Sequence, residues 1–589
     1  MKNFREACLS KKTGCAEYIV ILLYIAGITI IGHFHEYCFD EAQAWQIARS
    51  ASIKEILTVI PHYEGHPPLW HLILAPFAKL GTPFDLSMRL VNTVFSGGAV
   101  CLLLFRSPFP KAIKCTLPFT YFFFYQYGVI CRPYSMMMLA FMLMAATYKE
   151  RSKKPWRYIL SLCFLCLTSS FGIILACGLC LVWTGEILAE LKKNDKLRQF
   201  WLDKRFIPLV LILLLAILLY IMTQTADDCY YKGVETDNYL LKSLQSWKSY
   251  AFALYLPYES WNGTLLDNEY SAVPSTASIL LNSLFGIVAW TLLISFTRKN
   301  HKFLTFFIPY MMLTVFQAFF YISVHHLGIG TLFHIFIFWI MAEENDGIQV
   351  PEFMKKLAGG IKSPLIRKLG AAGAGGIYMM NVLFSAVSSF NDIRYACYPT
   401  GAADYIKAHH LEDRKIMIGW GYEFDGSKNG SEKSKENENE NWFMRMAIPS
   451  NHPPVINNKT LICGLGSLYL PYFDRNIFMN FNVRFPDDLY MHYAYKEDVQ
   501  EEFRLWREQG LPDIIIDYCP IDEVYGKEAV KDVRYCVIAE FPYHMNFKLN
   551  TTDEKVYMYM REDLIDEYPD IDILYDPRVA GVYDPGQDQ

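Results

Sequence analysis

Two short polar segments near the N-terminus carry the residues of this chain that could do chemistry. Asp40 and Glu41 follow the first hydrophobic segment, and His66 stands directly before Pro67-Pro68-Leu69. A carboxylate within hydrogen-bond reach can accept the proton of an attacking hydroxyl group, and Asp40 is the candidate for this general base. Unpaired charge is costly at a membrane surface, and an ionisable residue there indicates a functional site. The alternative is that Asp40 and Glu41 only solvate the end of a helix.

The composition predicts a protein that lies partly in a bilayer and partly in water. The 589 residues are 52% hydrophobic, which is too apolar for one soluble core, yet 20% are charged. The formal net charge is −5, and the stretch from Thr551 to Gln589 is strongly acidic. This charge distribution argues against nucleic acid as a partner.

Hydrophobic segments predict eleven membrane spans. Basic residues precede an apolar run from about Tyr18 to Gly32 without a small-residue cleavage site, which favours an uncleaved first helix with a cytoplasmic N-terminus. The other spans are expected at Leu86 to Phe105, Cys115 to Ile130, Tyr134 to Tyr148, Tyr158 to Ser169, Phe171 to Leu188, Phe206 to Met222, Ile279 to Phe296, Phe303 to Ser323, Leu327 to Met341 and Ala371 to Val387.

The segment from Leu69 to Leu80 decides the topology. If it spanned the membrane, the basic connection from Lys149 to Arg157 would lie outside, against the positive-inside rule. We therefore predict a re-entrant or juxtamembrane helix that begins after Pro67-Pro68. The exterior side then holds Gly32 to Asp85, the turn at Arg132, Thr223 to Ser278 and everything after about Ser388.

The last 200 or so residues predict a small soluble α/β domain. Short β-rich runs alternate there with helical patterns; the runs are Lys415 to Trp420, Asp513 to Tyr518, Arg534 to Phe541 and Lys555 to Met560, and the helical patterns are Ala402 to His410 and Tyr495 to Gln509. The polar segment from Gly426 to Asn441 predicts a mobile loop. The fold class is therefore a polytopic α-helical membrane protein, residues 1–390 with a first exterior loop at 33–85, followed by an extracytoplasmic α/β domain, residues 391–589.

The first exterior loop resembles that of the membrane glycosyltransferases with the GT-C fold, which use polyprenyl-phosphate sugars and include protein O-mannosyltransferases and lipid A aminoarabinose transferases. Asp40-Glu41 and His66-Pro67-Pro68-Leu69 match their acidic pair and His-Pro-Pro-Leu-type element in order and approximate spacing. The resemblance implies an inverting transfer of a sugar from a lipid phosphate to a glycan, lipid or protein acceptor. Asp40 would be the base, and Glu41 and Glu64 would orient acceptor, water or a divalent ion.

Cations are expected where the leaving phosphate gains charge, because arginine can bind phosphate in a bidentate way. Arg132, in Ile-Cys-Arg-Pro-Tyr, resembles the Arg-x-Tyr turn of these relatives, and Arg89 is a second candidate. His325 and His326 could bind the lipid phosphate, although adjacent histidines cannot both face one site on a helix. The alternatives are snorkelling of Arg132 to lipid headgroups and simple interfacial packing of the histidines.

His66 could bind substrate, take part in binding a possible divalent cation, or mainly fix the turn at Pro67-Pro68. No metal-specific pattern surrounds it, so no cofactor is assigned. The expected partners are the donor, its acceptor and membrane lipids. Two other classes stay open: a transporter or flippase, and a non-enzymatic receptor whose exterior domain binds a ligand.

Overall fold

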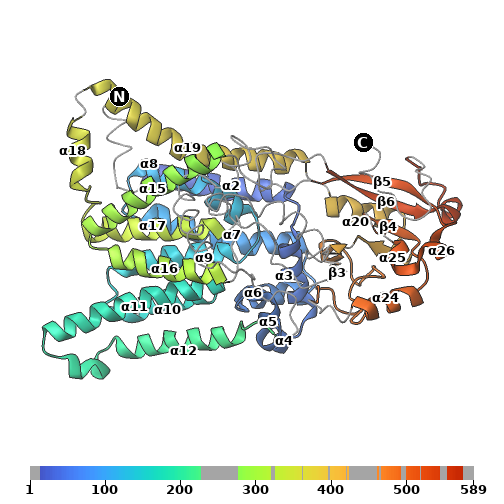
Figure 1. The fold of residues 1–589 in the computed structure, drawn as a ribbon, viewed down its shortest axis with the longest axis horizontal. Helices are drawn as coiled ribbons and strands as arrows, with labels where there is room; N and C mark the ends of the chain where they lie inside the picture. Colours follow the sequence, from blue (N-terminus) through green and yellow to red (C-terminus); the bar gives the residue numbers. More distant parts are fainter. Residues whose placement is uncertain are drawn as a thin grey trace.

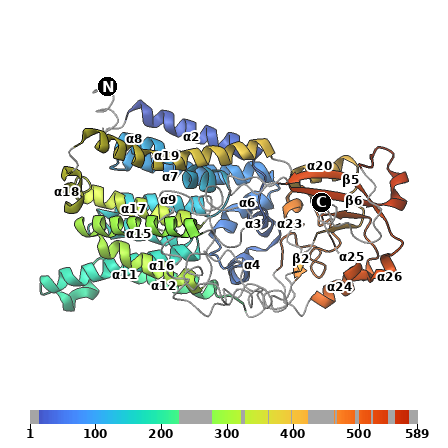
Figure 2. The same cartoon turned by 45° about the horizontal axis from the view of Figure 1, so that its top comes forward.

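The computed structural model is a bundle of apolar helices with a small α/β unit at one end (Figure 1). The residues that the structure describes are 14–226, 276–319, 326–360, 363–395, 398–419, 421–422, 461–462, 466–492, 499–517, 519, 521–543 and 554–574. Four short helices, α3 to α6, lie between the bundle and the α/β unit in both views (Figures 1 and 2). The candidate polar segments of the sequence belong to this middle layer.

Helices form at the apolar segments that the sequence predicts. Their bounds are α2 Cys15–Phe34, α7 Phe84–Arg106, α9 Tyr134–Tyr148, α10 Pro155–Cys166, α11 Ser170–Lys193, α12 Phe206–Met222, α15 Thr276–Lys299, α16 Phe303–Phe319, α17 Leu327–Glu344 and α19 Pro364–Tyr395. Within the described residues, five helices are long and apolar enough to cross a membrane: α2, α7, α11, α17 and the helix that begins at Pro364. These helices indicate a membrane-associated protein.

The expected helix from Cys115 to Ile130 is irregular. The chain forms α8 (Lys111–Thr116), the 3₁₀ turn η1 (Leu117–Phe119) and the π-helix η2 (Phe122–Val129). Pro118 lies at the break, where it cannot donate a backbone hydrogen bond. The Asn92 side chain donates to the Gly128 carbonyl at 2.8 Å, so a neighbouring helix satisfies a carbonyl of η2. π-Helical turns are frequent at functional sites, and η2 leads directly to Arg132.

Basic connections meet at the end of the bundle away from the α/β unit (Figure 1). Arg151, between α9 and α10, forms ion pairs of 2.9 Å with Glu186 of α11 and Glu344 of α17. Lys302, between α15 and α16, also pairs with Glu344, at 2.6 Å. Two basic connections, α9–α10 and α15–α16, are therefore both in contact with Glu344.

The Pro67-Pro68 element begins a short helix, as expected. Pro68 is the N-cap of α6 (Leu69–Lys79), which has 11 residues. At 1.5 Å per residue this helix is about 16 Å long, roughly half of the hydrocarbon thickness. It packs against α3 (Phe39–Ser50) around a buried core that includes Trp45 and Trp70. Its length therefore agrees with a helix that does not span.

The C-terminal unit is a four-stranded mixed sheet with the order β1-β4-β6-β5. Its strands are β1 Ile416–Ile418, β4 Ile514–Ile516, β5 Tyr535–Tyr543 and β6 Glu554–Arg561, each within the segment predicted for it or a few residues beyond. The two predicted helices are also present, as α20 (Tyr398–Ala408) and α24 (Val499–Glu508). The predicted loop from Gly426 to Asn441 lies outside the described residues.

Polar contacts dock this unit onto α3. The Gln43 side chain donates to the Met491 carbonyl at 3.0 Å and accepts from the Met491 N–H at 2.8 Å. Arg49, two turns further along α3, donates to the Phe473 carbonyl at 2.8 Å and pairs with Asp474 at 3.1 Å. The helix that carries Asp40 and Glu41 is therefore held by the C-terminal unit along its length.

Candidate functional site

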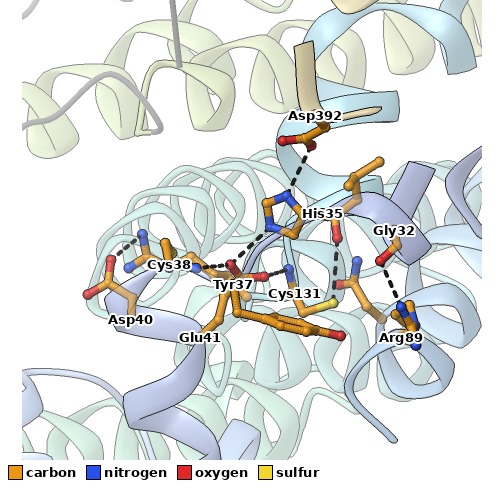
Figure 3. Close-up of polar contacts among 12 residues, drawn as sticks. Gly32, His35, Tyr37, Cys38, Asp40, Glu41, Arg89, Cys131 and Asp392 are labelled. Atoms are coloured by element: carbon orange, nitrogen blue, oxygen red, sulfur yellow. Dashed lines mark hydrogen bonds and ion pairs between the residues drawn. The ribbon is translucent and has the colours of Figure 1, made fainter. Parts of the chain in front are cut away.

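The first turn of α3 directs its two carboxylates to different environments. Cys38 is the N-cap, and Glu41 at the third position accepts a hydrogen bond from the Cys38 N–H at 2.8 Å. Successive helical residues project about 100° apart, so Asp40 and Glu41 cannot face the same way. Figure 3 shows Glu41 turned toward His35 and Cys131, and Asp40 turned away from them.

Glu41 is fully buried, and both of its carboxylate oxygens have hydrogen-bond partners. Besides Cys38, the N–H of Cys131 and Nε2 of His35 contact its oxygens, the latter at 3.2 Å. Burial raises the pKa of the Glu41 carboxyl, but His35 and the two N–H groups outweigh burial and leave the pKa below its ordinary value. A carboxylate held in this way is suited to fixing the backbone around it. The structure therefore gives Glu41 a positioning geometry, without the free oxygen that a base requires.

Asp40 is the accessible member of the pair. Its side chain is 47% exposed, and Oδ2 lies 2.9 Å from Nη1 of Arg132. The Arg132 side chain is 13% exposed, and its guanidinium lies 5.3 Å from the ring centre of Tyr134. Burial opposes the charge of Arg132, but Asp40 keeps the pKa of the guanidinium raised. The structure thus joins the predicted base to the predicted phosphate-binding arginine.

Two of the predicted histidines lie close to Arg132. His66 precedes α6, and His326 is the N-cap of α17. Burial, followed by the Arg132 charge, lowers the pKa of His66 to about 4. Burial, Arg132 and His66 together lower the pKa of His326 well below its ordinary value. Both imidazoles are neutral near pH 7, and either can donate one hydrogen bond without adding charge.

His326 also contacts aromatic rings. Its ring centre lies 4.4 Å from that of Phe171 and 5.9 Å from that of Tyr134. His326 therefore packs against aromatic rings and also lies close enough to Arg132 for the charge of Arg132 to lower its pKa. His325 lies outside the described residues.

Arg89 and Glu64 have other neighbours. Arg89 of α7 donates to the Gly32 carbonyl near the end of α2 at 2.9 Å, and it lies on the far side of Glu41 from Asp40 (Figure 3). Glu64 accepts a 3.3 Å hydrogen bond from Gln43, the residue that docks the C-terminal unit. The structure thus places Arg89 beside the end of α2 and Glu64 beside the docking contact.

Two residues of this region have no sequence signal that would have identified them. His35 follows α2, and its Nδ1 lies 3.0 Å from Asp392 of α19 (Figure 3). An acidic residue within a predicted apolar helix would have been the only hint, but Asp392 falls just beyond the predicted span that ends at Val387.

A metal site is the remaining question about this region. In the described part of the chain, no group of three or more His, Cys, Asp or Glu side chains is placed to hold a metal ion. Comparison with known proteins gives no further guide: no protein-family model matches the chain, and neither a curated protein nor a solved structure matches it.

Proposed function

We propose that the chain is an inverting membrane glycosyltransferase that moves a sugar from a polyprenyl-phosphate donor to an acceptor on the extracytoplasmic or luminal face. In this proposal the apolar helices and η2 make eleven spans of a GT-C-like domain, with α6 as a juxtamembrane helix. The N-terminus is cytoplasmic and the C-terminal α/β unit extracytoplasmic. The basic connections gathered at the opposite end of the bundle support this orientation.

The ion pair between Asp40 and Arg132 carries the proposal. An accessible carboxylate and a largely buried guanidinium lie 2.9 Å apart at the end of the apolar helices nearest the α/β unit. A transfer from a lipid phosphate needs a proton acceptor and a phosphate-binding cation at one point near the membrane surface. The pair supplies both groups. Asp40 comes from α3 and Arg132 from the turn after η2, so helix capping within one segment explains their contact less well.

The reaction is a single displacement. A hydroxyl group of the acceptor attacks the anomeric carbon, and its proton passes to Asp40. The new carbon–oxygen bond forms as the bond from the anomeric carbon to the phosphate oxygen breaks, so the electron pair leaves with the lipid phosphate. Arg132 stabilises the charge that this phosphate gains. One displacement inverts the anomeric centre, and no second carboxylate is needed as a nucleophile.

The histidines and the docked unit complete the proposed site. Neutral His66 and His326 donate hydrogen bonds to the sugar or the phosphate without competing with Arg132 for charge. Glu64 lies beside the Gln43 contact to Met491, where an acceptor held by the C-terminal unit would approach. Arg89 supports the site through the end of α2. Addition and chelation of Mg²⁺ in the assay tests for a divalent ion.

The test is transfer from a panel of radiolabelled polyprenyl-phosphate sugars by the purified protein in lipid. We expect one donor to be used, and Asp40→Asn to reduce kcat by about 100-fold or more, because a general base contributes that much. Asp474→Asn is the matched control, since Asp474 also forms an Asp–Arg pair, at 3.1 Å with Arg49, but in the docking contact. This variant should keep its activity.

Two results would overturn the proposal. One is the absence of both transfer and donor hydrolysis for every donor, with the protein shown to be folded; transport or ligand-binding assays would then address the flippase and receptor alternatives. The other is equal activity of Asp40→Asn and Asp474→Asn. Inversion is checked separately, by determining the anomeric configuration of the product.

A further inference from the structure

His35 connects three parts of the chain through one imidazole ring. Its Nδ1 lies 3.0 Å from Asp392 of α19, and its Nε2 lies 3.2 Å from Glu41 of α3. The side chain is 7% exposed, and the two carboxylates are 3% and 0% exposed (Figure 3). Both ring nitrogens therefore face carboxylate oxygens, and only an imidazolium can donate a hydrogen bond to each.

The charges around the ring favour its protonated form. Burial lowers the pKa of His35, but Asp392 and Glu41 outweigh burial and leave the pKa well above its ordinary value. One positive charge then lies between two negative ones in a site closed to water. Removal of either carboxylate leaves the ion pair between His35 and the other carboxylate, but His35 then holds its proton less strongly.

Other titratable groups face this cluster from the same loop and from the elements packed against it. Tyr37 and Cys38 lie in the same loop, and the ring centre of Tyr37 is 5.9 Å from that of His35. Cys131 lies in the turn before α9. Burial raises the pKa of all three side chains. Tyr125 of η2 hydrogen bonds Asp392. Glu36, the next residue in the chain, is a carboxyl whose pKa burial also raises. Asp85 and Arg89 of α7 also act on Tyr37 and Cys131, so this acid and this base belong to the charged surroundings of the cluster. His35 contacts Glu41 and Asp392 directly.

Glu41 transmits the position of His35 to the proposed site. One Glu41 oxygen contacts His35 and the Cys38 N–H, and the other accepts from the Cys131 N–H. Arg132 directly follows Cys131 in the chain, and Asp40 directly precedes Glu41. A shift of the Glu41 carboxylate would therefore move both ends of the Asp40–Arg132 pair.

Glu36, the residue after His35, links the loop between α2 and α3 to the C-terminal unit. The hydroxyl of Thr400 in α20 lies 2.9 Å from both the Glu36 carboxylate and the Tyr472 hydroxyl. His35 and Glu36 are thus held by α19 and α20, the helices that lead from the bundle into the α/β unit.

We infer that His35 is a protonated positioning residue held between Asp392 and Glu41. Through these two contacts it couples α19, which leads to the C-terminal unit, to the geometry of Asp40 and Arg132. The role in catalysis rests on the proposed function; the coupling of Asp392 to the α3 loop does not. A raised histidine pKa means that the clamp is intact below about pH 6.5 and is lost as pH rises through the folded-state pKa. The device is therefore sensitive to alkaline pH.

The experiment compares the wild type with Asp392→Asn in lipid between pH 6 and pH 9. Asp404→Asn is the matched control, because Asp404 is an exposed aspartate in α20, just beyond Asp392 in the chain. The first readout is amide hydrogen exchange at Cys38 and Cys131, whose N–H groups donate to Glu41. The second is kcat and KM for the donor. The charge-neutral variant His35→Gln, with a single donor group, provides an independent check.

We expect Asp392→Asn to shift the alkaline loss of both exchange protection and kcat to lower pH, by about one to three pH units, because one opposing charge has gone. KM for the donor should change little, and in His35→Gln kcat should be low and nearly independent of pH. Exchange and pH profiles equal to those of Asp404→Asn would overturn the inference while leaving the proposed function intact. If no donor is used by the wild type, the proposed function fails, and the exchange data alone decide whether Asp392 holds the α3 loop.

Discussion

Asp40 and Arg132 lie 2.9 Å apart, one in the first turn of α3 and the other in the turn that follows the π-helix η2. The contact brings a negative side chain from the first exterior loop against a positive one from the helical bundle. Arg132 is mostly buried while Asp40 is half exposed. The cation is therefore fixed by its surroundings, and the carboxylate stays accessible to an incoming group.

Replacement of Arg132 by lysine tests whether the planar guanidinium is needed. Lysine keeps the charge but loses the fork that binds phosphate through two hydrogen bonds. We expect kcat for the donor to fall by about tenfold in Arg132→Lys and by about 100-fold or more in Arg132→Ala, by analogy with the loss of one transition-state donor. The same change at Arg49, which pairs with Asp474 in the docking contact, should leave kcat near that of the wild type. Equal losses at both arginines would contradict the assignment.

Protonation of His66 should destabilise the fold in acid. The folded-state pKa is about 4, below the ordinary value of 6.5. As pH falls from 6.5 toward 4, the unfolded chain binds a proton that the folded protein does not, so stability decreases over this window. Thermal unfolding should show a smaller loss of Tm between pH 6.5 and pH 4 in His66→Gln than in the wild type. His62→Gln, on the partly exposed helix α5 (Ile60–Glu64), is the control and should follow the wild type.

Gln43 should hold the C-terminal unit to α3. Gln43→Ala removes two hydrogen bonds to the Met491 backbone, a loss of about 1 to 3 kcal/mol. We expect faster amide exchange at Met491, because its N–H loses the acceptor, and a lower Tm. Gln509→Ala removes a single 3.0 Å hydrogen bond to the Met479 carbonyl within the C-terminal unit. Exchange at Met491 should not change in that control, and an unchanged rate in Gln43→Ala would refute the docking role.

Substitution of Gly65 tests the turn that positions His66. Its φ is +65°, and a Cβ added there would meet no atom within 4 Å, so only backbone strain opposes a side chain. Gly65→Ala should therefore destabilise the protein by about 1 kcal/mol. Gly185 in α11 has equally open space but helical backbone. Gly185→Ala should be neutral or stabilising, and a comparison of the two Tm values separates strain from steric conflict.

Local patterns in the sequence were enough to identify most of the elements. Long apolar runs predicted the bundle helices, and short β-rich runs predicted β1, β4, β5 and β6. Pro67-Pro68 predicted the start of α6, because proline fixes φ and is tolerated where helical N–H groups lack partners. In each case the determining interaction lies within a few residues, so the sequence contains its signal. The π-helix was missed because Asn92 of another helix helps to satisfy it.

The candidate site was determined only in part by the sequence. The residue types and their order singled out Asp40, His66 and Arg132, but not which of Asp40 and Glu41 is accessible. That distinction arises because the Glu41 carboxylate is enclosed by His35, Cys38 and the Cys131 N–H. The pairing of His35 with Asp392 joins residues more than 300 positions apart. Such contacts depend on how α2, α3 and α19 pack together, and only the tertiary structure could decide them.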